Sequence, residues 1–478
     1  MSDRPGQNGG RAKSPSALDD LAPLHLIGIG GAGMSAIARV LLARGVAVSG
    51  SDMKDTPGLA ALRALGARVF VGHDEASVDG AAAVVVSSAI RETNPELVAA
   101  RALGLPVMHR AQILSMLMRE RRGVAVTGTH GKTTTTSMIS LVFERAGLDP
   151  SFLIGGDLNE RGTNAHSGTG EWLIAEADES DGSFLWLGPE IAVITNIEAE
   201  HLDHYRDEAE VRDTFLAFTE NVLPDGTVVM CADDPGVQAV LPQVRRGVVT
   251  YGLDAGEWRA VREAREGGQR LDVTFHGRSM GSATLSVPGA HNARNALAAF
   301  ATAATAGIPF ERAAIALASF QGVQRRFQLR GLVDGVTVVD DYAHNPTKVR
   351  AALDAAREQR PGRVVAVFQP HLYSRTQFFA RQLGAALATA DVVVVTDVYG
   401  AREDPIPGVT GKLVVDGVLE KTPRKRVAYI PKRTEVAAYV ASVARAGDFV
   451  LTIGAGDVTM LGDEIVRLIG AATSRRAG

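Results

Sequence analysis

Apolar residues along the chain fall into three successive series of short runs separated by helix-like segments. In the first series, we expect strands at 24–29, 46–49 and 83–87, with amphipathic helices at 34–42 and 59–65 between them. Further strands are expected at 124–126, 172–175 and 191–195, and then at 336–339, 364–368, 392–395 and 450–453. Runs that are apolar throughout are typical of parallel strands covered by helices on both faces. The pattern therefore predicts three α/β units.

Between about 248 and 287 the pattern changes to alternating apolar and polar residues with glycine turns, as at Leu271, Val273 and Phe275. This alternation predicts an antiparallel ribbon at the edge of the middle unit. The predicted organisation is a disordered tail (1–20), a Rossmann-like domain (21–117), a central domain with a parallel sheet of the P-loop ATPase type and a small antiparallel part (118–325), and a C-terminal Rossmann-like domain (326–478).

Charge and cysteine content narrow the possible functions. A formal charge of -4 over 478 residues gives no reason to expect a nucleic-acid groove or a basic membrane-binding face. The single cysteine, Cys231, cannot form an internal disulfide, which fits a reducing cytoplasm. The first twenty residues lack the apolar segment of a signal peptide, and no apolar run approaches the ~18 residues of a membrane-spanning helix. We expect a cytoplasmic protein.

A first glycine-rich turn, Gly28 to Gly33, matches G-x-G-x-x-G between an expected strand and an expected helix. Small residues there let backbone amides approach a diphosphate at the positive end of the helix dipole. Asp52, about twenty residues further on, is placed to accept from a ribose hydroxyl. A tight turn without a ligand, a nicotinamide or flavin site, and a site for another nucleotide diphosphate all fit this motif alone.

A second glycine-rich turn, Gly128 to Thr134, also joins an expected strand to an expected helix, and this helix should end before Gly147. The order Gly-Lys-Thr provides amides for phosphate oxygens, Lys132 for the β and γ phosphates and Thr133 for Mg²⁺. A strict Walker sequence would have glycine where this chain has Val126. The sequence therefore predicts a shortened phosphate loop, different from that of a GTPase or kinase.

A magnesium ion at such a loop usually needs carboxylate help from neighbouring strand ends. Glu176 follows the expected strand 172–175 and opens the acidic run 176–181. His201 lies a few residues beyond the strand 191–195 and is a second candidate ligand, although a solvated acidic loop and a surface histidine are the alternatives.

Six segments together, taken in order, resemble the Mur ligase family. They are T-G-T-H-G-K-T-T-T at the second turn, A-E-A-D-E-S-D at 175–181, 196–204, G-A-H-N-A-R-N-A at 289–296, R-R-F at 325–327 and D-D-Y-A-H-N-P at 340–346. Within the family, G-I-G-G-A-G-M at the first turn and Q-P-H-L-Y-S-R-T at 369–376 are similar to the members that add L-alanine to a UDP-linked muramic acid. One departure is Asn345, where relatives more often carry a second histidine.

The resemblance implies a role for each candidate residue. The UDP-sugar would be bound by Gly28, Gly30, Gly31, Gly33, Asp52, Ser87 and Ser88. ATP would be bound by Gly128, Thr129, His130, Gly131, Lys132, Thr133, Thr134, Asn292, Asn295, Arg326 and Asp341, with Arg325 the weaker arginine candidate. The amino acid would be bound by Tyr342, His344, His371 and Arg375. Lys132, Glu176 and His201 would be catalytic, and Thr133, Glu176 and His201 would hold two Mg²⁺ ions.

The implied reaction is ATP-dependent formation of an amide between UDP-N-acetylmuramate and L-alanine through an acyl phosphate, in peptidoglycan precursor synthesis. ATP and Mg²⁺ would be required, nucleic acid and membrane would not be partners, and the chain would be a monomer or homodimer. A muropeptide-recycling ligase of the same family, which attaches a tripeptide, is the nearest alternative. A nicotinamide-dependent oxidoreductase would leave the second phosphate loop and the third α/β unit unexplained.

Overall fold

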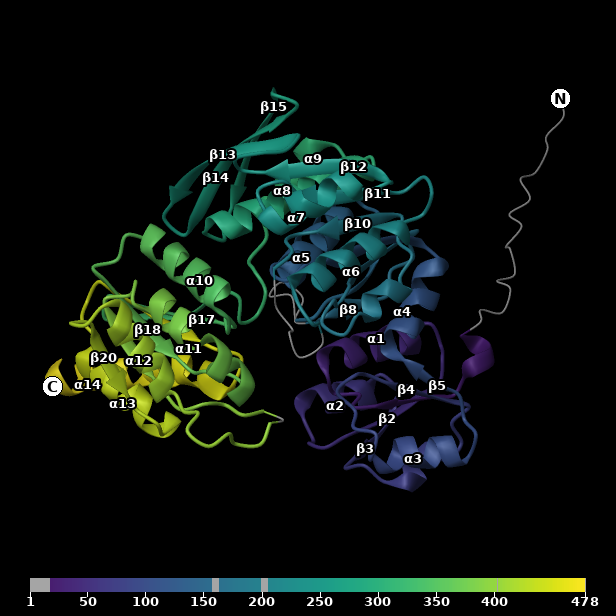
Figure 1. The fold of residues 1–478 in the computed structure, drawn as a ribbon, viewed down its shortest axis with the longest axis horizontal. Coiled ribbons are helices and arrows are strands. Elements are labelled where there is room, and N and C mark those ends of the chain that lie inside the picture. The colour runs from purple at the N-terminus through teal and green to yellow at the C-terminus, as the bar shows by residue number, and fades with distance from the viewer. Residues whose placement is uncertain (1–17, 157–162, 199–204, 402, 478) are drawn as a thin grey trace.

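The computed structural model describes residues 18–156, 163–198, 205–401 and 403–477, which form three units that follow one another along the chain (Figure 1). Each unit is built on its own sheet, with five, ten and six strands respectively. The predicted fold class is confirmed. Most of the predicted tail, and His201 of the candidate site, lie outside the described residues.

The N-terminal unit contains a fully parallel sheet with the strand order β3-β2-β1-β4-β5. Its strands are β1 (Leu24–Ile27), β2 (Val48–Asp52), β3 (Arg68–Val71), β4 (Ala83–Val86) and β5 (Val107–His109), and its helices are α1 (Ala32–Ala43), α2 (Pro57–Ala64), α3 (Pro95–Ala102) and α4 (Arg110–Arg119). All four residues of β1 are buried, the polar His25 among them, as expected for a central strand covered on both faces. The first glycine turn therefore leaves the centre of the sheet at its carboxyl edge.

The central unit has the strand order β15-β14-β13-β12-β11-β10-β6-β9-β7-β8. Its strands are β6 (Arg122–Thr127), β7 (Ser151–Leu153), β8 (Ala165–His166), β9 (Trp172–Glu176), β10 (Ile191–Ile194), β11 (Thr227–Cys231), β12 (Gly247–Gly252), β13 (Trp258–Arg265), β14 (Gly268–Phe275) and β15 (Arg278–Leu285). Strands β13, β14 and β15 pair antiparallel at one edge, where the alternating pattern predicts a ribbon.

Five helices belong to the central unit: α5 (Lys132–Arg145), α6 (Glu208–Glu220), α7 (Pro235–Val240), α8 (Ala290–Thr305) and α9 (Phe310–Ala318). Helix α5 is buried over nearly its whole length, and its apolar residues share one core cluster with those of α8 and α9. This packing fixes the start of α5, where the second glycine turn enters the helix.

The C-terminal unit has the strand order β16-β17-β21-β18-β19-β20, in which only the edge strand β16 is antiparallel. Its strands are β16 (Gln328–Val333), β17 (Val336–Asp341), β18 (Arg363–Phe368), β19 (Val392–Val395), β20 (Arg426–Tyr429) and β21 (Asp448–Ile453), and its helices are α10 (Pro346–Glu358), α11 (Tyr373–Leu387), α12 (Lys412–Lys421), α13 (Arg433–Val443) and α14 (Met460–Ala477).

The predicted domain boundaries stay predictions. The position 117/118 falls within α4, and 325/326 falls in the segment between α9 and β16. Among the described residues, no helix is long and apolar enough to cross a membrane.

Candidate nucleotide and substrate sites

The second glycine turn is a tight loop between β6 and α5. Gly128 and Gly131 have φ values of 125° and 82°, a region that side chains rarely adopt. A Cβ atom at Gly128 would lie 2.2 Å from Thr195 Oγ1, and one at Gly131 would lie 2.7 Å from Asn295 Oδ1. Both positions therefore require glycine. The loop ends at the first turn of α5, where backbone N–H groups and the helix dipole favour phosphate.

Residues beyond the end of β10 hold this loop in place. Thr195 Oγ1 donates to the His130 carbonyl at 2.6 Å, and the His130 backbone N–H donates to Asn196 Oδ1 at 2.7 Å. Glu198 Oε2 lies within hydrogen-bond distance of His130 Nε2, at 3.0 Å. The loop is thus fixed by two neighbouring strands of the parallel sheet, at their carboxyl ends.

Lys132 is the first residue of α5, and its ammonium group contacts two oxygens. Its Nζ donates to the Gly128 carbonyl at 2.7 Å and to Glu179 Oε1 at 2.8 Å. Burial alone would lower the pKa of Lys132, but the carboxylates of Glu179, Asp178 and Glu176 raise it above its usual value. Burial raises the pKa of Glu179 to about 7. Lys132 therefore keeps its positive charge beside the phosphate loop.

Thr133 and Glu176 lie together, as the metal prediction requires. Thr133 Oγ1 donates to Glu176 Oε1 at 3.1 Å, and Glu176 Oε2 accepts from the Gly155 backbone N–H at 2.7 Å. A hydroxyl beside a carboxylate is an oxygen set of the kind that Mg²⁺ prefers, so these two residues fit the ion. Among the described side chains, no group of three or more His, Cys, Asp and Glu residues could hold a metal.

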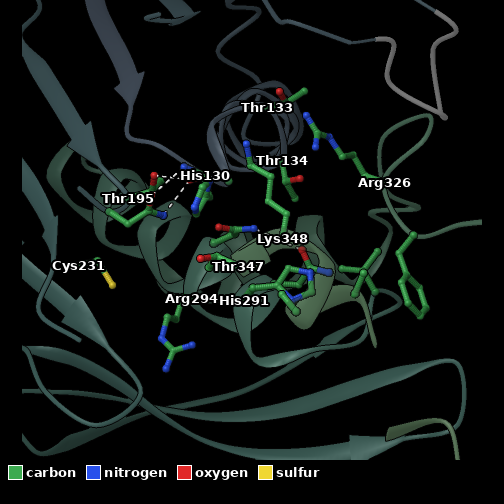
Figure 2. Close-up of a pocket in the computed structure, with 18 of the residues that line it drawn as sticks. His130, Thr133, Thr134, Thr195, Cys231, His291, Arg294, Arg326, Thr347 and Lys348 are labelled. Atoms are coloured by element: carbon green, nitrogen blue, oxygen red, sulfur yellow. Dashed lines mark hydrogen bonds between the residues drawn. The ribbon is translucent and has the colours of Figure 1, made fainter. Parts of the chain in front are cut away.

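A cavity of about 320 Å³ opens beside the phosphate loop, between the central and C-terminal units (Figure 2). Its lining includes eight of the predicted ATP residues: His130, Gly131, Thr133, Thr134, Asn292, Asn295, Arg326 and Asp341. Gly128, Thr129 and Lys132 are outside this lining. In Figure 2, Thr133 and Arg326 lie at one end of the cavity and Cys231 and Arg294 at the other.

The two predicted asparagines face the cavity from the first turns of α8. Asn292 Nδ2 donates to the Pro288 carbonyl at 2.7 Å, and Asn292 Oδ1 accepts from Asn295 Nδ2 at 3.3 Å. On the C-terminal side, Asp341 accepts backbone N–H groups of Phe327 and Ala343, each at 2.8 Å. Burial raises the pKa of Asp341, against the opposing effect of Arg326.

The two adjacent arginines, Arg325 and Arg326, differ in position. Arg326 lines the cavity, whereas Arg325 Nη2 donates to the carbonyls of Gly454 and Gly456 at 3.0 Å each. Arg325 thus binds the backbone of the C-terminal unit itself.

The first glycine turn is a tight loop between β1 and α1. Gly28 has a φ of 76°, and the Gly30 backbone N–H donates to Asp52 Oδ2 at 3.0 Å. Asp52 therefore supports the loop directly. At the start of α1, a Cβ at Gly33 would lie 3.2 Å from the Arg110 guanidinium. This cation faces the helix N-terminus from α4.

The predicted amino-acid residues form one group on the C-terminal unit. The rings of Tyr342 and His344 lie 5.3 Å apart, and those of His344 and His371 lie 6.0 Å apart. Arg375 lies in the first turn of α11, and its Nη1 lies 3.1 Å from His371 Nδ1. Arg326 stacks over the Tyr342 ring at 5.0 Å, which connects this group to the nucleotide cavity.

Comparisons with known proteins agree with this arrangement over most of the chain. Three family models match in order: "Mur ligase family, catalytic domain" at residues 23–122, "Mur ligase middle domain" at 126–303 and "Mur ligase, glutamate ligase domain" at 325–456. The chain belongs to the Mur ligase family. The UDP-N-acetylmuramate–L-alanine ligase of Mycolicibacterium gilvum is 50% identical to this Mur ligase, over 95% of this chain and 98% of that protein.

Solved structures give the same result for the fold. The UDP-N-acetylmuramate-alanine ligase of Thermotoga maritima is similar with a TM-score of 0.80 and 32% identity, over 94% of this chain and 99% of that one. A murein peptide ligase from Psychrobacter arcticus, at 24% identity, shares the fold with a TM-score of 0.69 over 94% of this chain and 98% of that one.

Several residues of this Mur ligase's cavity were missed by the sequence reasoning. His291, Arg294 and Asp233 line it from the central unit, and Arg294 Nε donates to Asp233 at 2.7 Å. Burial lowers the pKa of His291 to about 4, so its ring is neutral at pH 7. His291 and Arg294 share a helix turn with the predicted asparagines, and that spacing is the signal that could have found them.

Two further cavity residues, Thr347 and Lys348, come from the C-terminal unit. They lie in the first turn of α10, which Asn345 caps by accepting the Lys348 backbone N–H at 2.8 Å. An Asn-Pro pair at 345–346 is a recognisable helix start, so the position of this turn was predictable. Its approach to the phosphate loop was not.

The acidic run 176–181 is not the solvated loop that the sequence allowed as an alternative. Asp178 accepts from Arg110 Nη2 at 2.8 Å, and Asp181 lies 3.6 Å from His109 Nε2. Burial opposes the ionisation of Asp181, but hydrogen bonds from Ser183 and Ser88 lower its pKa below the usual value. Ser88, a predicted UDP-sugar residue, thus lies at the contact between the N-terminal and central units.

Proposed function

We propose that this Mur ligase joins L-alanine to UDP-N-acetylmuramate in an ATP-dependent reaction of peptidoglycan precursor synthesis, acting in the cytoplasm, where ATP is available. The proposal rests on the relatives of about 50% identity that carry this activity. The observation that carries it in the structure is the continuity of the two predicted sites. Arg326 lines the nucleotide cavity and stacks on Tyr342, the first residue of the amino-acid group.

Amide formation from a carboxylate needs a leaving group, and the γ-phosphoryl group of ATP supplies one. A carboxylate oxygen of the lactyl group attacks the γ-phosphorus of ATP. The bond between the γ-phosphorus and the β,γ-bridging oxygen breaks, which releases ADP and forms an acyl phosphate. The alanine amine then attacks the acyl carbon, loses a proton and expels inorganic phosphate. Positioning and neutralisation of charge are the main tasks of the protein in such a transfer.

The residues at the second glycine turn suit these tasks. We assign the N–H groups at the start of α5 and the Lys132 ammonium to the β and γ phosphates. Thr133 and Glu176 would hold Mg²⁺, which neutralises phosphate charge when bound, and His201 is proposed as a ligand of a second ion. Arg326 and Asp341 bring the C-terminal unit to the nucleotide.

The amine component would bind at Tyr342, His344, His371 and Arg375. A guanidinium pairs with a carboxylate through two parallel hydrogen bonds, so Arg375 suits the carboxylate of a free amino acid. The diphosphate of the UDP-sugar would bind at the first glycine turn, where Arg110 adds a positive charge.

The test is phosphate release from ATP with UDP-N-acetylmuramate and each candidate amine in turn. We expect turnover only when the UDP-sugar and L-alanine are both present, because the amine is needed to consume the acyl phosphate. Turnover with the tripeptide L-alanyl-γ-D-glutamyl-meso-diaminopimelate and none with L-alanine would instead identify a recycling ligase. Nicotinamide oxidation without a requirement for ATP would overturn the ligase assignment.

A further inference from the structure

Helix α10 forms a large part of the wall that the C-terminal unit contributes to the nucleotide cavity. Four of its residues, Thr347, Lys348, Ala351 and Ala352, line the cavity. The orientation of this helix relative to the central unit therefore determines the shape of the site. In Figure 1, α10 lies between the antiparallel ribbon and the rest of the C-terminal unit.

The central unit contacts α10 at both ends and in the middle. At the start, Thr347 Oγ1 donates to Glu198 Oε2 at 2.9 Å, and the same carboxylate oxygen lies 3.0 Å from His130 Nε2 of the phosphate loop. In the middle, a Cβ at Gly289 would lie 3.2 Å from the Ala355 methyl group, so the two helices approach closely.

The third contact comes from the hairpin of β13 and β14. Arg262 donates from Nη1 to Glu358 Oε2 and from Nη2 to Glu358 Oε1, both at 2.7 Å. In the turn of the hairpin, the Gly267 backbone N–H donates to Gln359 Oε1 at 3.1 Å. Arg262 and Glu358 are only 21% and 22% exposed, so this two-pronged pair is better shielded from water than a typical surface ion pair.

Arg262 also connects the hairpin to the helix that carries the predicted ATP asparagines. Its Nη1 donates to Gln269 Oε1, the side-chain amide oxygen, at 3.4 Å. Gln269 is buried, and its amide nitrogen donates to the carbonyls of Val287 and Gly289 at 2.8 and 3.1 Å. Gly289 is the residue before α8. One hydrogen-bonded path therefore runs from the end of α10 to the start of α8, across the cavity's two walls.

We propose that the β13–β14 hairpin is a docking arm for the C-terminal unit, and that Arg262 and Glu358 are positioning residues for ATP. Neither residue lines the nucleotide cavity. Their pairing holds α10 against α8 so that the two helices form the nucleotide cavity. This inference rests on the ATP part of the proposed function.

The test uses charge reversal and its rescue. Arg262→Glu and Glu358→Arg each place like charges opposite one another. The double variant restores the ion pair with the two charges exchanged between positions 262 and 358. Calorimetric titration with a non-hydrolysable ATP analogue should give a Kd that is about tenfold higher for each single variant and within about threefold of wild type for the double variant. Arg265→Glu is the matched control, because Arg265 is on the same strand as Arg262 but pairs with the exposed Glu263 at 3.0 Å, whereas Arg262 pairs with Glu358.

The Tm and the KM for UDP-N-acetylmuramate distinguish a positioning role from a general loss of structure. Both should stay near the wild-type values in the Arg262 and Glu358 variants. Single variants that bind the analogue as tightly as wild type, or a double variant no better than the single ones, would overturn the docking arm. Because titration needs neither UDP-sugar nor alanine, a wild-type chain that binds the analogue but makes no alanine amide would contradict the proposed function alone. A wild-type chain that binds no nucleotide would contradict both.

Discussion

The charge of Lys132 suits a phosphate ligand at the second glycine turn. Its ammonium is buried, yet its pKa is raised, because Glu179 and the neighbouring carboxylates surround it. A phosphate would therefore compete with Glu179, which accepts a hydrogen bond from Lys132 at 2.8 Å, for the same positive charge. Burial raises the pKa of Glu179 to about 7. This carboxyl group can therefore take up a proton near neutral pH when Lys132 turns from it to a phosphate.

Replacement of Lys132 tests the phosphate site. We expect Lys132→Ala to lower turnover by about three orders of magnitude or more, since removal of a charge that stabilises a transferring phosphoryl group commonly costs several kcal/mol. Steady-state phosphate release would measure this, with circular dichroism to confirm the fold. Lys412→Ala is a suitable control, because Lys412 is an exposed residue of α12 that pairs with Asp416. More than about a tenth of the wild-type rate in Lys132→Ala would place the γ-phosphate elsewhere.

The secondary-structure elements that carry the glycine turns were well predicted from local sequence. The strand at 124–126, the turn and a helix ending before Gly147 correspond to β6 and to α5, which ends at Arg145. Glycines with positive φ and a buried apolar strand are local properties, so a single sequence contains them. The position of the antiparallel ribbon was predictable for the same reason. Its contact with α10 was not, because Arg262 and Glu358 are 96 residues apart.

Helix α11 offers a test of the amino-acid site. Arg375 lies in its first turn and His371 just before its start, with 3.1 Å between Arg375 Nη1 and His371 Nδ1. Arg375→Lys keeps the charge but loses the planar fork that fits a carboxylate. The KM for L-alanine should rise at least about tenfold, or roughly 1.4 kcal/mol, with little change in the KM for ATP or UDP-sugar.

An unchanged alanine KM together with a large effect on the ATP KM would reassign Arg375 to the nucleotide. Tyr342 and His344 would then remain the candidates for alanine recognition. The kinetic distinction is clear because Arg375 is outside the residues that line the nucleotide cavity.

The arrangement of the three units depends on contacts between residues that are distant in the sequence. Arg110 and Asp178 are 68 residues apart, and Thr347 and Glu198 are 149 apart. No periodicity or turn signal contains such pairings, because they arise only when complete units pack together. For this reason the sequence left a solvated loop open for Asp178, Glu179 and Asp181, although Asp178 and Asp181 form part of the contact between the N-terminal and central units.

Arg110, which takes part in this contact between the N-terminal and central units, is also predicted to bind the UDP-sugar. Its guanidinium lies against Gly33 at the start of α1 and pairs with Asp178, which follows the metal candidate Glu176 by two residues. The cation therefore lies between the predicted diphosphate site and the predicted phosphoryl-transfer site. Arg110→Ala should raise the KM for UDP-N-acetylmuramate at least about tenfold, because a charge-assisted contact to a diphosphate is lost.

The Kd for an ATP analogue should stay near that of wild type in this variant, since Arg110 does not line the nucleotide cavity. Arg63→Ala is the control, because Arg63 on α2 of the same unit pairs only with the exposed Asp55 among its recorded contacts. If Arg110→Ala weakened ATP and UDP-sugar binding equally, the residue would act by holding the two units together. If it left both unchanged, the diphosphate would have to be held by the glycine turn without help from α4.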